Sequence, residues 1–134
     1  MFMIYQRPMS TAQVDAVNRN PESSLAKAYM GLLFPNEDNA QERVNAALNV
    51  GLYQRTMLIG ATDGGSVTLE QVFDAGNGHP GKGVNVVSMG SHPSMSVGDI
   101  AVSLLDDDAY LCMPHGWHVL DMELSLEPAS YKCD

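Results

Sequence analysis

The sequence contains few cysteines, few basic residues and no long apolar run. Cys112 and Cys133 are the only cysteines among 134 residues, which excludes a disulfide-stabilised scaffold. No apolar run approaches the roughly 18–20 residues that a membrane helix requires. Residues 1–8 lack the basic region, apolar core and cleavage site of a secretory signal. We therefore expect a cytoplasmic protein with reduced thiols that does not contact a membrane.

The scarcity of basic residues gives the chain a strong negative charge. Seven Lys and Arg stand against sixteen Asp and Glu, for a net charge of -9. Residues 1–56 are neutral, and residues 57–134 carry eleven carboxylates against two lysines. Such a surface repels nucleic-acid phosphates, so direct nucleic-acid binding is not expected. The asymmetry instead indicates a partner with a basic surface.

The hydrophobic content and the length of the chain are sufficient for a single folded domain over residues 1–134. The hydrophobic content of 45% is that of a globular protein, and a chain of this length can bury an adequate core. Helix signals dominate residues 1–52, and strand signals dominate residues 53–124. Residues 125–134 are interpreted as a tail.

Three helices are predicted within residues 10–50. Ser10 with Gln13 has the pattern of a capping box, and Asn39 with Glu42 repeats it. Pro21 suits the first position of the second helix. That helix carries an apolar stripe with the spacing of one buried face. The stripe consists of Leu25, Ala28, Tyr29, Leu32 and Leu33.

Strands are predicted at residues 2–5, 53–61 and 84–88, with a short helix after Thr68. Tyr53, Met57, Ile59 and Ala61 are expected to share one strand face. Residues 99–124 predict a three-stranded antiparallel meander that turns at residues 106–108 and 114–116. The expected fold class is α+β, with N-terminal helices packed on one face of a mostly antiparallel sheet.

Four residues near the last predicted turn combine sulfur, imidazole and carboxylate groups. They are Cys112, His115, His118 and Asp121. A zinc site on them would lack the second separated ligand pair of the usual signatures, unless His79 or His92 completed it. They also suggest a cysteine/histidine nucleophile, as does Ser88 with His92. A small metal-dependent or cysteine/histidine hydrolase is therefore the alternative to a binding protein.

A glycine-rich stretch imitates a phosphate-binding loop. Gly76, Gly81 and Lys82 have the spacing of that motif, but Gly83 stands where Ser or Thr should hold magnesium. A predicted helix precedes the stretch and a β-branched run follows it, which is the reverse of the required context. We interpret it as a flexible loop, and no cofactor is expected.

The densest charge cluster is Asp106, Asp107 and Asp108. It suits a solvated turn that keeps a sheet edge from pairing, or an acidic patch that meets a basic partner. Calcium is disfavoured because the three aspartates lack the alternate spacing of an EF-hand. Trp117, the only tryptophan, either fills the core near the surface or anchors an interface. Asp106, Asp107, Asp108, His115 and Trp117 are the candidate binding residues.

The second half also resembles a known family, the YodL-like domain, over about residues 53–123. The resemblance is carried by residues 68–73, Asn77, His79-Pro80, residues 94–102, Tyr110 and Gly116-Trp117. It implies a small accessory domain of phages, plasmids and other mobile elements, without an established catalytic residue set.

Together these features predict a non-enzymatic accessory protein of a mobile genetic element. Its acidic C-terminal half is expected to bind a basic protein surface. Such a surface occurs on host nucleic-acid-handling enzymes, where carboxylates can imitate phosphate. The sequence leaves the oligomeric state open, a homo-oligomer included.

Overall fold

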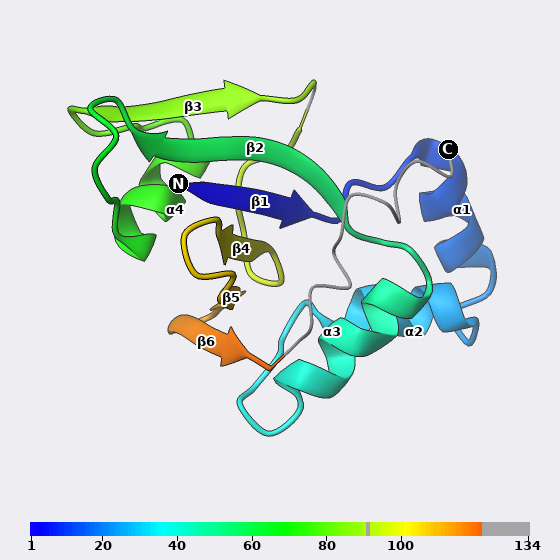
Figure 1. Cartoon of the computed structure of the whole chain (residues 1–134). Helices are drawn as coiled ribbons and strands as arrows, with labels where there is room; N and C mark the ends of the chain where they lie inside the picture. Colours follow the sequence, from blue (N-terminus) through cyan, green and yellow to red (C-terminus); the bar gives the residue numbers. More distant parts are fainter. Residues whose placement is uncertain (91, 122–134) are drawn as a thin grey trace.

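A six-stranded sheet with helices on both of its faces forms the described part of the chain (Figure 1). The computed structural model describes residues 1–90 and 92–121. Cys133, the predicted tail and residues 122–124 of the predicted last strand lie outside the described residues.

All neighbouring strands of the sheet are antiparallel, in the order β3-β2-β1-β4-β5-β6. The strands are β1 (Phe2–Gln6), β2 (Gln54–Ala61), β3 (Val84–Ser88), β4 (Ile100–Ser103), β5 (Ala109–Met113) and β6 (Gly116–Leu120). The helices are α1 (Thr11–Arg19), α2 (Ser24–Gly31), α3 (Ala40–Asn49) and α4 (Leu69–Gly76). The α+β class is confirmed, and β4, β5 and β6 form the predicted meander.

Each face of the sheet carries a hydrophobic core cluster, which the sequence did not predict. Tyr5 packs in a cluster with Ala28 and Val44 of α2 and α3, whereas Ile4 packs in another with Val72 of α4. Successive residues of a strand point to opposite faces, so these helices cover opposite sides of the sheet. Helices α2 and α3 lie on the expected face, and Figure 1 shows α4 apart from them.

A β-bulge explains how β2 and the residue directly before it, Tyr53, contribute to different clusters. The register pairs Ile4 with Met57 but Tyr5 with Arg55, which leaves Thr56 as an extra residue on β2. One extra residue exchanges the two faces of a strand. The expected single face therefore divides: Tyr53 belongs to the cluster of α2 and α3, and Met57 and Ile59 belong to that of α4.

Two of the predicted helix starts are confirmed. The hydroxyl of Ser10 accepts a hydrogen bond from the backbone N–H of Gln13, whose side chain accepts one in return from Ser10 N–H. The same reciprocal bonds join Thr68 and Gln71 at the start of α4. Each capping box satisfies two backbone donors at a helix start that lack intrahelical partners.

The predicted start of the second helix is wrong, whereas the third helix, α3, does begin directly after Asn39 but without the expected capping bond. Helix α2 begins at Ser24 with Ser23 as its cap, and Pro21 lies in the preceding turn. Asn39 makes no side-chain cap bond to α3, because its backbone is already helical, with φ -117° and ψ 0°. Its side chain instead accepts a hydrogen bond from Asn36 N–H, and Asn36 accepts one from Asn39 N–H.

The apolar stripe of α2 is partly buried. Leu32, which follows the last residue of the helix, is 0% exposed, and Ala28 is also buried. The side chains of Leu25, Tyr29 and Leu33 are half-buried. The stripe thus holds α2 against the sheet mainly through Ala28 and Leu32.

Replacing Leu32 with Ala should lower the free energy of unfolding by about 2–5 kcal/mol, because the substitution removes transfer energy and leaves a cavity. Phe34→Ala is the matched control, since Phe34 is 80% exposed and should change stability by no more than about 0.5 kcal/mol. Urea unfolding followed by circular dichroism measures both values. Equal effects of the two substitutions would contradict the assigned burial.

Candidate functional site

The predicted cluster of Cys112, His115, His118 and Asp121 is divided by the register of the β5–β6 hairpin. Asp121 directly follows β6, and its backbone N–H donates to Gln41 Oε1 at 2.7 Å. Leu111, which packs with α2 and α3, pairs with His118, whereas Cys112 pairs with Trp117. Cys112 and His118 therefore lie on opposite faces of the sheet. No group of three or more His, Cys, Asp or Glu that could hold a metal occurs among residues 1–90 and 92–121.

The environment of Cys112 keeps its thiol protonated. The residue is buried, and its burial, together with the nearby Asp99 carboxyl, raises the pKa of Cys112 to about 12. The thiolate is the form that attacks substrates and binds metals. At neutral pH this side chain thus behaves as a small apolar group.

The structure does bring Ser88 and His92 together. Ser88 Oγ lies 3.0 Å from His92 Nε2, and His92 Nδ1 lies 3.0 Å from the carbonyl oxygen of Pro93. With the proton on Nδ1, the ring can accept from Ser88 and donate to Pro93, as in a nucleophile–base pair. An acyl-transfer site also needs a cleft and oxyanion donors. Neither residue lines the cavity between α2 and α3 or the one between α4 and the β5–β6 hairpin.

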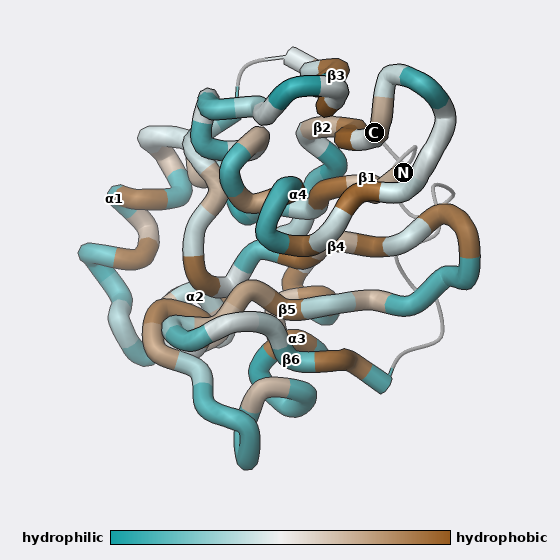
Figure 2. Tube along the Cα trace, turned by 90° about the vertical axis from the view of Figure 1, so that its left-hand side faces the viewer, coloured by the Kyte–Doolittle hydropathy of each residue, from teal (hydrophilic) through white to brown (hydrophobic). Residues whose placement is uncertain are grey.

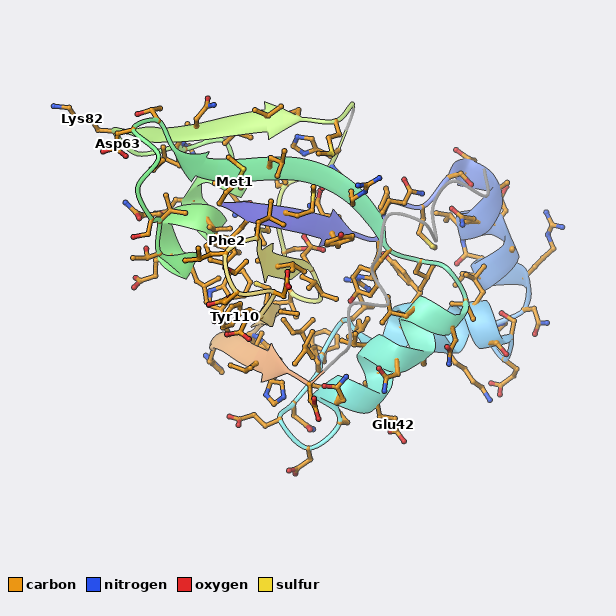
Figure 3. The ribbon with its side chains drawn as sticks, viewed as in Figure 1. Met1, Phe2, Glu42, Asp63, Lys82 and Tyr110 are labelled. Carbon is orange, nitrogen blue, oxygen red and sulfur yellow. The ribbon has the colours of Figure 1, made fainter. Side chains whose placement is uncertain are left out.

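The glycine-rich loop lies between α4 and β3, so the context of a phosphate-binding loop is absent, as predicted. His79 is exposed there and is held by its backbone N–H, which donates to the carbonyl of Asp74. Lys82 is exposed beside Asp63, well away from Tyr110 (Figure 3).

The three consecutive aspartates lie fully at the surface, in the turn between β4 and β5. Asp106 Oδ1 accepts a hydrogen bond from Asp108 N–H, and Asp107 has a φ of 65°. None of the three makes an ion pair with another described residue. Partial burial and the carboxylates of Asp108 and Asp106 raise the pKa of Tyr110 in the neighbouring strand.

Exposed apolar side chains border these aspartates. Leu105 is 88% exposed, and Figure 2 shows the hydrophobic segment that passes into the hydrophilic one in this turn. Val119, which pairs with Tyr110 across the β5–β6 hairpin, is also exposed. Phe2, which is half-buried, makes an edge-to-face contact with Tyr110, with ring centroids 6.4 Å apart; Figure 3 labels both residues. We call Leu104–Asp108 the acidic turn.

Trp117 combines features of its two predicted roles, a core residue near the surface and an interface anchor. It is half-buried and packs against the cluster of α4. It also lines a cavity of about 300 Å³ between α4 and the β5–β6 hairpin, together with Phe73 and Cys112. His115 lies at the tip of the same hairpin and is exposed. The structure thus places Trp117 and His115 near one another at the tip of the β5–β6 hairpin, at the opposite end of β5 from the acidic turn.

A second cavity, of about 480 Å³, lies between α2 and α3. Lys27 and Arg43 line it with mostly small side chains. Both basic side chains already have partners: Lys27 Nζ lies 3.5 Å from Glu22 Oε1, and Arg43 donates to the carbonyl of Gly31 at 2.8 Å. This cavity lies in the electrically neutral half of the chain.

A buried polar network at the end of β1 was not predicted from the sequence. Gln6, which is 0% exposed, donates through Nε2 to Asp99 Oδ2 at 3.0 Å and accepts from the Thr56 hydroxyl at 2.7 Å. Asp99 Oδ2 also accepts from Ser96 N–H at 2.9 Å. The signal available in the sequence was a glutamine at the end of an apolar strand, and its partners are 50 and 93 residues away.

The same network holds residues 96–99 against the helices. The Tyr53 hydroxyl donates to the carbonyl of Gly98 at 2.6 Å, and Arg7 donates to the carbonyls of Val97 and Tyr29. The Arg7 guanidinium also lies over the Tyr29 ring, 5.4 Å from its centroid. Gly98 has a φ of +96°, which favours glycine.

No family model matches this chain, and no curated protein or solved structure shows significant similarity to it. The resemblance to the YodL-like domain therefore stays a prediction from the residues quoted above. Among the described helices none can cross a membrane, since the longest has 10 residues.

Gly98→Ala should destabilise the fold much more than Gly116→Ala. Both glycines have a φ near +90°, where alanine costs about 1–2 kcal/mol. A Cβ on Gly98 would also lie 2.8 Å from the carbonyl oxygen of Leu32, whereas one on Gly116 would meet nothing within 4 Å. The overlap should add about 1–3 kcal/mol, measured by urea unfolding. A smaller loss for Gly98→Ala than for Gly116→Ala would be inconsistent with the packing of this loop.

The burial of Asp99 predicts a specific pH dependence. Burial raises the pKa of Asp99 from 3.8 to about 6, although hydrogen bonds from Gln6 and Ser96 oppose the shift. The folded state therefore binds this proton more tightly than the unfolded state does. The contribution of Asp99 to stability should fall by about 2–3 kcal/mol as the pH rises from 3.8 to 6.

Asp99→Asn tests this dependence because asparagine keeps an acceptor and does not ionise. The free energy of unfolding is measured for both proteins between about pH 4 and pH 7, and the difference between them cancels the other carboxylates. The parent should lose stability relative to the variant as the pH rises. A constant difference across this range would show that Asp99 has an ordinary pKa.

Proposed function

We propose that this protein is a small non-enzymatic accessory protein that acts in the cytoplasm and binds a basic protein surface through its acidic C-terminal half. The observation that carries the proposal is the acidic turn. Its three carboxylates are exposed, make no ion pair with a described residue, and stand beside exposed apolar side chains. Charge next to apolar area is the composition of a surface that recruits a partner electrostatically and then buries area against it.

The distribution of charge supports the same proposal. Lys82 is the only Lys or Arg between residues 57 and 121, and it lies beside Asp63 rather than near Tyr110 (Figure 3). Lys82 therefore does not neutralise the carboxylates of the acidic turn, none of which makes an ion pair with a described residue. The negative field of such carboxylates raises the rate at which a basic partner associates and lowers the affinity for nucleic acid.

The biological setting of the proposal depends on the sequence resemblance. Residues 53–123 resemble the YodL-like domain, which implies an accessory protein of a mobile genetic element. A host enzyme that handles nucleic acid has a basic groove for phosphates, and a carboxylate-rich turn can occupy such a groove. This is the class of partner that the charge favours.

Replacing Asp106, Asp107 and Asp108 with Ser should slow association with a basic partner and flatten its salt dependence. A peptide of alternating arginine and alanine serves as the probe, and surface plasmon resonance at low and high sodium chloride measures the association rate. Because the three side chains are exposed, the fold should be retained, as judged by circular dichroism. Screening acts over about 8–10 Å, so the parent rate should fall with salt.

The control variant removes three charges from the neutral half, by Asp15→Asn, Glu37→Gln and Asp38→Asn. All three positions are exposed. If this variant and the triple Ser variant slow association equally, net charge alone governs binding and the acidic turn is not the site. If moderate salt lowers the melting temperature of the parent, its carboxylates are stabilised by ion pairs, which contradicts the proposal.

A further inference from the structure

The groove beside Trp117 lies between α4, which contributes two carboxylates, and the β5–β6 hairpin, which contributes none. The α4 wall contributes Glu70, Phe73 and Asp74, and the hairpin wall contributes Cys112 and Trp117. Its volume of about 300 Å³ is at the lower end of the range for ligand pockets, so it suits one side chain rather than a large molecule. The groove is thus a small, open space between two carboxylates and two aromatic rings.

The α4 wall has a charge arrangement that favours a bound cation. Glu70 and Asp74 are four residues apart on one helix, so their carboxylates are neighbours and repel each other. Both are exposed, and neither makes an ion pair with another described residue. No lysine or arginine lines the groove. A cation between the carboxylates would relieve their repulsion.

The aromatic side chains favour a particular cation. Phe73 is 37% exposed and Trp117 is half-buried, so each keeps part of its ring accessible. A guanidinium group stacks on aromatic faces and pairs with carboxylates through its planar set of donors. A lysine ammonium is a point charge with stronger hydration, and it matches this combination less well.

The groove and the acidic turn belong to one surface. Tyr110 and Cys112 share a face of β5, and Val119 and Trp117 share the same face of β6. The groove lies at one end of this face, near residues 114–116, and the acidic turn at the other. A basic segment that crosses the hairpin therefore meets carboxylates at both ends and apolar side chains between them.

We propose that the groove between α4 and the β5–β6 hairpin receives an arginine side chain of the basic partner, with its guanidinium against Trp117 and Phe73 and between Glu70 and Asp74. This inference rests on the proposed function, because it names the residue type that the acidic surface recognises. The acidic turn accelerates the encounter, and the groove selects arginine.

Trp117 is the only tryptophan, so its fluorescence reports directly on the groove. The protein is titrated with an oligoarginine peptide, with an oligolysine peptide of equal length, and with an oligoglutamate peptide. Oligoarginine should change the fluorescence saturably, oligolysine should bind more weakly, and oligoglutamate should have no effect. Calorimetry on the same samples measures binding independently of Trp117.

The double variant Glu70→Gln/Asp74→Asn removes the carboxylates while keeping the side-chain shapes. It should weaken the binding of oligoarginine by roughly tenfold. The matched control, Glu37→Gln/Asp38→Asn, removes the same charge from exposed positions in the neutral half and should change binding by less than about twofold.

The outcomes separate this inference from the proposed function. If oligoarginine binds by calorimetry and requires Asp106–Asp108 but leaves Trp117 fluorescence unchanged, the groove inference is overturned and the proposed function stands. Equal affinities of the two double variants, or of oligoarginine and oligolysine, also overturn the inference. If neither basic peptide binds at all, the proposed function fails and the groove inference fails with it.

Discussion

The buried amide of Gln6 is the interaction on which the rest of the structure depends. Its two ends join three segments: the carbonyl accepts from Thr56 on β2, and the amide nitrogen donates to Asp99 before β4. A buried amide without partners would cost about 1–3 kcal/mol, so these bonds constrain how the segments align. The β-bulge on β2 is part of this arrangement, because Thr56 is its extra residue.

The position of Asp99 in turn places the candidate binding surface. Asp99 and Gly98 stand directly before β4, and their backbone bonds to Cys112 join this segment to β5. From that point the meander alternates regularly, so Tyr110 and Trp117 point to the face of the sheet that α4 covers only in part. The polar network thus helps to place the groove beside Trp117 through its backbone bonds to Cys112, and the acidic turn through the start of β4.

Signals within short stretches of the sequence correctly predicted those structural features that depend on only a few consecutive residues. Two capping boxes, the meander and the exposure of Asp106–Asp108 follow from bonds or solvation within a few positions of the chain. The errors are equally local. Pro21 suits the start of a helix by residue type, but the Ser23 hydroxyl caps the helix instead, and Asn39 precedes α3 as predicted but bonds to Asn36 rather than capping the helix. Residue type alone does not choose between two local arrangements of similar energy.

The sequence by itself determined the α+β class, the order of most elements and an acidic second half, because periodicity, caps and charge are properties of short segments. Only the tertiary structure decided which residues meet. It put Cys112 and His118 on opposite faces although they are six residues apart, and it joined Gln6 to Asp99 across 93 residues. The reason is strand register: a shift of one residue reverses every side chain, and register is set by pairing between strands that are distant in the chain.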